Sequence, residues 1–194
     1  MLSKTPQQVS TCWGVLSTPS VFLRKSISNR LVKHIKIRKQ MANTYSQIYI
    51  QMIFAVKRRE ALIDKAWRPD LFRYTTGTVQ GLGQKILAVG GVEDHIHIFF
   101  SYHNLTMPIP DIVRETKKAT NKWVNDNHLS PFYFEWQDGY GAFSYSRSQM
   151  DKVCKYVLNQ EEHHKKITFR EEYLDFLEKF EVPYDERYIF KFFD

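Results

Sequence analysis

The sequence predicts an α+β fold in which the elements follow the order β-α-β-β-α-β, with an antiparallel sheet and both helices on one face. Short β-branched and aromatic runs alternate with longer stretches whose apolar residues recur at helical spacing. Two of the runs are joined by a short turn, whereas the others are separated by a predicted helix. With 194 residues, 43% of them hydrophobic, the chain is long enough for one domain with a substantial core.

The first half of this domain contributes a strand, a helix and a hairpin. Residues 44–56 are rich in β-branched and aromatic side chains, which is typical of a buried strand. Residues 62–82 carry apolar side chains at helical spacing, at Leu62, Trp67, Leu71, Tyr74 and Val79. Residues 85–102 then predict two strands with a turn near Glu93 and Asp94.

A second helix and a last strand complete the sheet. Residues 107–128 have helical periodicity and open with Pro110 and Asp111, as helix starts often do. In residues 132–146 we expect a strand, a loop marked by glycines and another short extended piece. This order is that of a ferredoxin-like split unit, whose second sheet face is left free for a site or a partner.

Further helices follow the sheet. Residues 148–166 predict a third helix with Ser148 as a possible N-cap, and this helix carries Tyr156. Residues 169–182 are a short amphipathic helix, and the aromatic tail after them is expected to pack on the domain.

Residues 1–40 show no convincing period and precede the single domain that we expect over residues 41–194. They contain eight lysine and arginine residues and no acidic residue. We favour an upstream segment read through from an early start codon, because residues 41–51 resemble a natural start. A transit peptide and a basic disordered arm stay open as alternatives.

The net charge of +7 comes from this N-terminal segment. Residues 41–194 carry 20 basic and 21 acidic residues, so a phosphate-binding surface there requires local clustering. No window approaches 18 uninterrupted apolar residues, so a membrane span is not expected. The two cysteines, Cys12 and Cys154, are too few for a disulfide framework and fit a reducing cytoplasm, which is the expected location.

Two histidines interrupt the apolar run of the second hairpin strand. Because side chains alternate along a strand, His95, His97 and Phe99 face one side while the apolar residues between them face the core. The two imidazoles then lie within reach of one metal ion or one phosphate. The alternative is a pair of half-exposed surface histidines, which a bare His-x-His motif favours.

A second polar cluster lies on the predicted third helix. Tyr156 and Gln160 are four residues apart and share a face, and His163 and His164 lie about one turn further along. Taken alone, a tyrosine at such a position is more often a packing residue than a nucleophile.

Together the two clusters resemble the single-tyrosine HUH transposases of the small bacterial insertion-sequence (IS200-like) family. HUH stands for His-hydrophobic-His, here His95-Ile96-His97 in the segment "DHIHIF". The segments "WQDGYGAFSYS" and "YVLNQEEHHKK" follow in the same order, and the resemblance covers about Asn43 to Phe180.

The resemblance implies an enzyme of DNA transposition and recombination. His95 and His97 would bind Mg²⁺ or Mn²⁺, Gln160 would complete the metal shell, and Tyr156 would be the nucleophile. Such enzymes cleave and rejoin single-stranded DNA through a 5′-phosphotyrosine intermediate and recognise hairpins at the element ends. The family also implies a homodimer.

The sequence leaves the proton acceptor, the role of a second tyrosine and the DNA-binding residues unassigned. The metal, His163 or His164 could accept the proton of Tyr156, and Tyr145 offers a second tyrosine near the site. A basic stripe on the second helix could follow a DNA backbone, although such a face is often only solvated. Its members are Arg114, Lys117, Lys118 and Lys122.

Three other interpretations compete with this one. A histidine-triad nucleotide hydrolase would need a third histidine where Phe99 stands. Replication-initiation and plasmid-mobilising nucleases share the chemistry but usually carry additional domains. A catalytically inert, domesticated DNA-binding protein of the same fold is the main alternative, although neither cluster shows decay.

Overall fold

The computed structural model describes residues 45–58, 60 and 62–193. The predictions made for residues 1–40 lie outside these described residues. No helix in the described part of the chain is long and apolar enough to cross a membrane.

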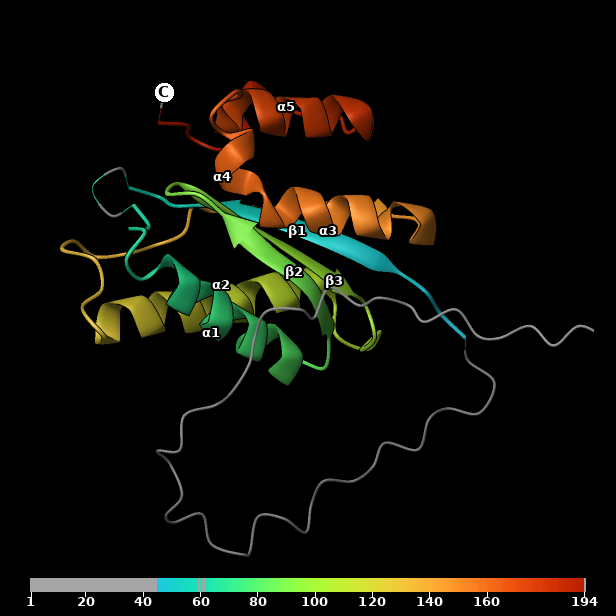
Figure 1. Cartoon of the computed structure of the whole chain (residues 1–194), viewed down its shortest axis with the longest axis horizontal. Coiled ribbons are helices and arrows are strands. Elements are labelled where there is room, and N and C mark those ends of the chain that lie inside the picture. The colour runs from blue at the N-terminus through green and yellow to red at the C-terminus, as the bar shows by residue number, and fades with distance from the viewer. Residues whose placement is uncertain (1–44, 59, 61, 194) are drawn as a thin grey trace, which may run out of the picture. The chain divides into compact units, whose positions relative to one another are not determined.

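Four strands form one antiparallel sheet in the order β2-β3-β1-β4 (Figure 1). Their bounds are β1 Tyr49–Ala55, β2 Lys85–Gly91, β3 His95–Ser101 and β4 Gly141–Tyr145. The central strand β1 is buried along its whole length, which explains its continuous apolar character. The hairpin turn falls between β2 and β3, as predicted, and the α+β, ferredoxin-like order of elements is confirmed.

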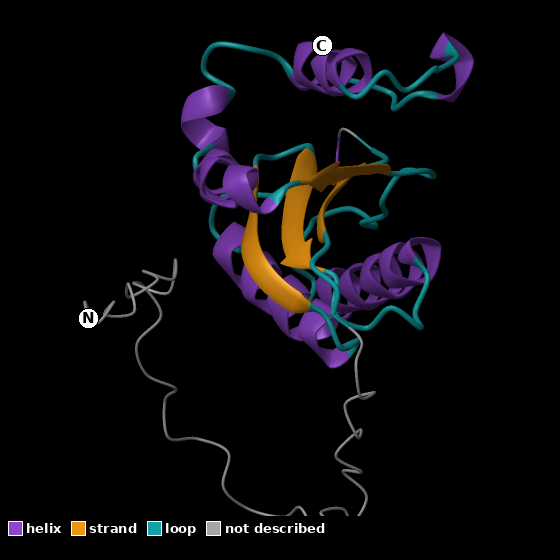
Figure 2. Cartoon of the chain, turned by 90° about the vertical axis from the view of Figure 1, so that its right-hand side faces the viewer, coloured by secondary structure: helices purple, strands orange, loops and turns teal. Residues whose placement is uncertain are grey.

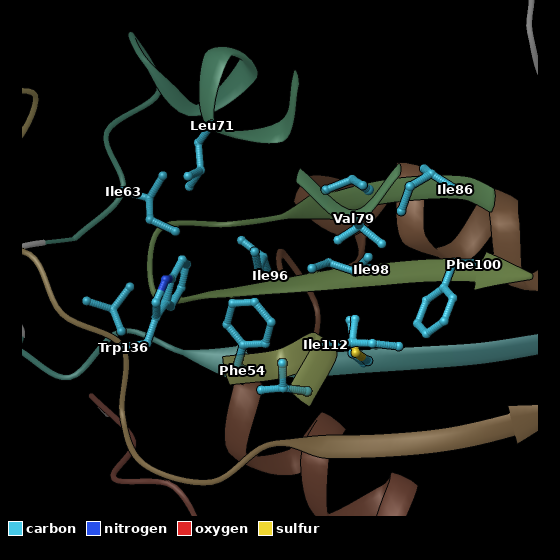
Figure 3. Close-up of a cluster of buried hydrophobic side chains, with 14 of the residues drawn as sticks. Phe54, Ile63, Leu71, Val79, Ile86, Ile96, Ile98, Phe100, Ile112 and Trp136 are labelled. Carbon is cyan, nitrogen blue, oxygen red and sulfur yellow. The ribbon is translucent and has the colours of Figure 1, made fainter. Parts of the chain in front are cut away.

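Two long helices cover one face of the sheet, as predicted. They are α1 Arg68–Gly81 and α2 Ile109–Asp126, and both lie below the sheet in Figure 1. The main core fills the space between these helices and the sheet. Its fully buried members include Phe54, Ile96, Ile98, Phe100, Leu71 and Ile112, whose side chains converge in Figure 3.

The opposite face of the sheet is not free, contrary to the prediction. Helix α3 (Met150–Leu158) packs on it through Val153, Cys154 and Val157. Helices α4 (Gln160–His163) and α5 (Phe169–Lys179) continue this layer, so the sheet lies between two helical layers (Figure 2). The tail contributes Phe190 and Phe192 to the aromatic cluster under α5, so the prediction that the tail packs on the domain is confirmed.

Residues 132–136, predicted as a strand, are irregular, and only Trp136 forms a bridge, to Val56. The side chain of Asn125 on α2 supplies the hydrogen bonds that a neighbouring strand would otherwise form with Phe134. Its Nδ2 donates to the carbonyl of Phe134 at 2.9 Å, and its Oδ1 accepts from the amide of the same residue at 2.9 Å. The aromatic residues that suggested a strand, Phe134 and Trp136, are instead buried as part of the main core.

The predicted third helix is divided in two at Asn159, where α3 ends and α4 begins. Its start also differs from the prediction. Ser146, rather than Ser148, forms a capping box with Gln149 and opens a 3-10 turn that leads into α3.

The elements also start later than the sequence patterns predict. The first strand begins at Tyr49, and α1 begins at Arg68 after a turn. Pro69 occupies the first turn of α1, where a missing backbone N–H costs nothing.

Candidate active site

The two histidines of β3 lie side by side on the sheet face covered by α3 and α5. Both are completely buried, and their ring centroids are 4.9 Å apart. Phe99 shares their face, whereas Ile96 and Ile98 point into the main core, so the predicted alternation is confirmed. The burial excludes the alternative of half-exposed surface histidines.

Tyr156 and Gln160 reach these histidines from the end of α3 and the start of α4. The ring of Tyr156 meets that of His97 edge to face at a centroid distance of 5.8 Å. Gln160 is 1% exposed, and its Oε1 lies 3.4 Å from Nε2 of His95. The structure thus brings together the four residues predicted as metal ligands and nucleophile, all within one chain.

Glu172 of α5 occupies the centre of this group, and sequence reasoning missed it. Its Oε1 accepts a hydrogen bond from the Tyr156 hydroxyl and another, at 3.2 Å, from Nε2 of Gln160. Its Oε2 lies 3.3 Å from Nε2 of both His95 and His97. A signal was present in the sequence, because Glu172 falls within the apolar stripe of its helix, formed by Phe169, Tyr173, Phe176 and Leu177.

His163 and His164 also face the centre. Nε2 of His163 lies 3.3 Å from Oε1 of Glu172. Nε2 of His164 lies 3.4 Å from Oε2 of Glu172 and 3.0 Å from Oε1 of Gln160. The two rings therefore belong to the polar cluster, and they are not merely part of a solvated helix face.

Burial and neighbouring charges shift the pKa values of the ionisable side chains in this site. Burial would lower the pKa of His95, but its hydrogen bonds with Asp94 and Glu172 outweigh burial and raise that pKa to about 9. Burial keeps the pKa of His97 below its ordinary value. Burial would raise the pKa of Glu172, but the surrounding imidazoles outweigh it and hold that pKa well below its usual range. At neutral pH the site contains a charged His95, a neutral His97 and an ionised Glu172.

The phenol of Tyr156 is held in its protonated form. Burial, followed by the negative charge of Glu172, raises its pKa far above the ordinary value. The hydroxyl therefore donates its proton to Oε1 of Glu172 at neutral pH.

The donor set fits a divalent metal ion. One ligand atom each from His95, His97, His164 and Glu172 lies within 4.8 Å of the others. Nε2 of His97 and Oε2 of Glu172 are buried without a hydrogen-bond partner among the described residues. Buried polar atoms that converge in this way are normally satisfied by an ion or by water.

Tyr145, the second tyrosine of interest, packs among apolar rings next to the polar cluster. Its ring packs against Phe99 at 5.9 Å and against Phe180 at 5.3 Å between centroids. Tyr156 is the tyrosine whose hydroxyl contacts Glu172.

The basic stripe of α2 lies on the other helical layer and is largely engaged in local contacts. Arg114 pairs with Asp111 at 2.6 Å, and Lys122 pairs with Asp126 at 2.5 Å. Lys117 donates to the carbonyls of Gln137 and Gly139, and burial lowers its pKa to about 8. The role of this stripe in DNA binding stays a prediction.

A surface pocket of about 310 Å³ opens beside Tyr156. It is lined by Lys155, Tyr156, Asn159, Glu162, His163 and Lys166. Tyr156 is only partly buried, so the pocket gives its ring a route to solvent.

Comparison with known proteins gives a family match for most of the domain. Residues 44–160 match the family model described as "Transposase IS200 like". A comparison with curated proteins finds no match.

Solved structures with a related chain path include a candidate transposase from Deinococcus radiodurans R1, at 20% identity and a TM-score of 0.49. That match covers 63% of this chain and 97% of the other. A REP-associated tyrosine transposase bound to a REP hairpin matches at 13% identity and a TM-score of 0.43, over 61% of this chain and 69% of the other.

Proposed function

Because the chain belongs to the IS200-like transposase family, we propose that it cleaves and rejoins single-stranded DNA in order to excise and insert an insertion sequence. One observation carries the proposal: the Glu172 carboxylate contacts the hydroxyl of Tyr156, both HUH histidines and Gln160. A surface packing residue would not require this convergence of buried polar groups.

Tyr156 is the proposed nucleophile. Its phenolic oxygen attacks the scissile phosphorus and gives up its proton as the new O–P bond forms, and the bond from phosphorus to the 3′-oxygen breaks. The 3′-oxygen leaves with one proton, so the number of protons is unchanged over the step, and the 5′ end stays attached to the tyrosine. A free 3′-OH on another strand end then reverses the step, so rejoining needs no ATP because the phosphodiester energy is kept in the covalent bond.

Glu172 and the histidines orient the nucleophile before attack. The carboxylate of Glu172 accepts the phenolic proton in a hydrogen bond, and the edge contact with His97 limits rotation of the ring. Fixing the attacking oxygen in this way lowers the entropic cost of reaching in-line geometry.

His95, His97 and Gln160 are the proposed metal ligands, and Mg²⁺ or Mn²⁺ is the proposed ion. When bound, such an ion acts as a Lewis acid on the phosphate and stabilises the charge that develops on it. The buried, unpartnered nitrogen of His97 supports this assignment. We also propose hairpins at the element ends as the DNA feature that is recognised, and a homodimer as the active form.

The pocket beside Tyr156 is the proposed entry for the DNA strand, because Lys155 and Lys166 line it. We expect Lys155→Gln combined with Lys166→Gln to weaken single-stranded DNA binding and to reduce the salt slope by about one unit. The measurement is affinity for a labelled oligonucleotide at several salt concentrations. Lys118→Gln on α2 tests the rival surface in the same assay, and a larger effect of that variant would assign binding to the α2 stripe.

The test of the proposed function is formation of a covalent protein–DNA adduct. The full chain would be mixed with labelled DNA from the element ends, single- or double-stranded, with Mn²⁺ or with EDTA, and separated under denaturing conditions. An adduct that requires both metal and single strands is expected. If binding persists but no adduct forms with the true end sequences, the chain is an inert DNA-binding protein of the same fold.

A further inference from the structure

Glu172 carries a deeply buried carboxylate, 2% exposed, whose Oε2 faces three imidazole nitrogens. Nε2 of His95 and of His97 lies 3.3 Å from its Oε2, and Nε2 of His164 lies 3.4 Å away. The same Oε2 has no hydrogen-bond partner among the described residues. Since buried polar atoms that converge without partners are normally satisfied by an ion or by water, this convergence indicates a position for a shared cation.

Hydrogen bonds at the Nδ1 atoms of His95 and His164 orient these rings so that Nε2 faces the centre of the site. Nδ1 of His95 lies 2.6 Å from the carboxylate of Asp94, and Nδ1 of His164 lies 2.9 Å from the carbonyl of Ile167. An ionised carboxylate and a carbonyl can only accept, so each Nδ1 carries a proton and donates it. When a metal ion replaces the Nε2 proton that a charged ring carries, Nε2 directs its lone pair toward the centre, as in metal sites whose ligands are oriented by a second hydrogen bond.

His97 has an equivalent outer partner in Gln51. The Gln51 amide lies 2.7 Å from Nδ1 of His97, and its own Oε1 is buried without a partner. Oxygen and nitrogen of an amide are distinguished by their hydrogen bonds, and turning this amide by about 180° places Oε1 against Nδ1 of His97. Oε1 then accepts from Nδ1–H, and His97 also directs its Nε2 lone pair toward Glu172.

We propose that His164 and Glu172 are metal ligands in addition to His95, His97 and Gln160, so that α5 supplies part of the metal centre. This inference rests on the proposed function only in taking His95, His97 and Gln160 as ligands. Glu172 would bind the ion through Oε2 while its Oε1 holds the hydroxyl of Tyr156. One carboxylate would thus fix the position of the nucleophile relative to the metal.

The donor set also predicts which class of ion binds. Imidazole nitrogens suit first-row transition ions, whereas Mg²⁺ prefers oxygen ligands and water. Three imidazoles and one carboxylate therefore favour a first-row transition dication, such as Mn²⁺ or Zn²⁺, over Mg²⁺.

The test is direct metal binding by the full chain without DNA. Free Mn²⁺ would be followed by electron paramagnetic resonance, with Mg²⁺ and Zn²⁺ as competitors. The wild-type protein should bind Mn²⁺ at least about tenfold more tightly than Mg²⁺. Glu172→Gln should weaken Mn²⁺ binding by at least about 100-fold, more than the loss of an outer contact usually does. Glu178→Gln, an exposed position on the same helix, is the matched control and should bind as the wild type does.

A second readout uses the wild-type protein alone, so it stays decisive if a variant does not fold. Nitrogen couplings of bound Mn²⁺ should report three imidazoles, and His164→Asn should reduce them to two. Two imidazoles in the wild type, unchanged Mn²⁺ affinity in folded Glu172→Gln, or equal binding of Mg²⁺ would each overturn the inference.

Adduct formation tests the proposed function separately. An adduct together with Glu172-independent Mn²⁺ binding would retain the function and overturn this inference. Glu172-dependent Mn²⁺ binding without an adduct would support the inference and count against the function.

Discussion

Replacing Tyr156 with phenylalanine is expected to remove the covalent protein–DNA adduct and to lower strand cleavage by more than about 10³-fold. The variant lacks the attacking oxygen but keeps the ring that packs against His97, His163 and Phe176. Glu172 keeps its hydrogen bond from Gln160, so the fold should be retained. Adduct yield on a denaturing gel, with unfolding curves of the same samples, measures both effects.

Tyr145→Phe is the matched control for this experiment. Tyr145 packs against Phe99 and Phe180, and its phenylalanine variant should form the adduct at nearly the wild-type level. If the adduct survives in Tyr156→Phe and disappears in Tyr145→Phe, the nucleophile has been assigned to the wrong tyrosine.

The largest expected effect on stability comes from Gly90→Ala in β2. A Cβ at this position would lie 1.8 Å from the backbone carbonyl oxygen of Val157, so α3 would have to move away from the sheet. We expect a loss of about 3 kcal/mol or more in the free energy of unfolding, at the upper end of overpacking effects. Because Gly90 pairs with His97 across the hairpin and α3 carries Tyr156, adduct formation should fall as well.

Gly77→Ala separates this steric effect from the general effect of replacing glycine. Gly77 lies within α1, and a Cβ there would have no atom within 4 Å. The helix should gain about 0.5–1 kcal/mol from this change. Urea unfolding of both variants provides the comparison. Equal midpoints for Gly90→Ala and the wild type would mean that α3 does not approach β2 as closely as the structure has it.

Much of the fold could be predicted because the relevant signals are local. The alternation of His95–Phe100 determined which side chains enter the core, since neighbouring side chains of a strand must face opposite sides. The element order predicted the antiparallel sheet and the two helices on one face. Residues 132–136 were predicted wrongly because their aromatic content signals burial, and burial alone does not specify a strand.

The candidate site was predictable only in part. The spacing of Tyr156 and Gln160 suggested a shared face, and they do face one site although the helix is divided at Asn159. The place of Lys117 was not predictable, because its acceptors are backbone carbonyls of a loop about 20 residues further along the chain.

The sequence by itself determined the identity of the motif residues and the faces on which they lie, because strand and helix periodicity orient side chains locally. Only the tertiary structure decided which of these faces meet. His95 and Gln160 are 65 residues apart, and Glu172 joins them because the apolar stripe of α5 packs over the histidine face of the sheet. That packing buries a carboxylate among imidazoles, and its need for a compensating positive charge makes these separate segments one site.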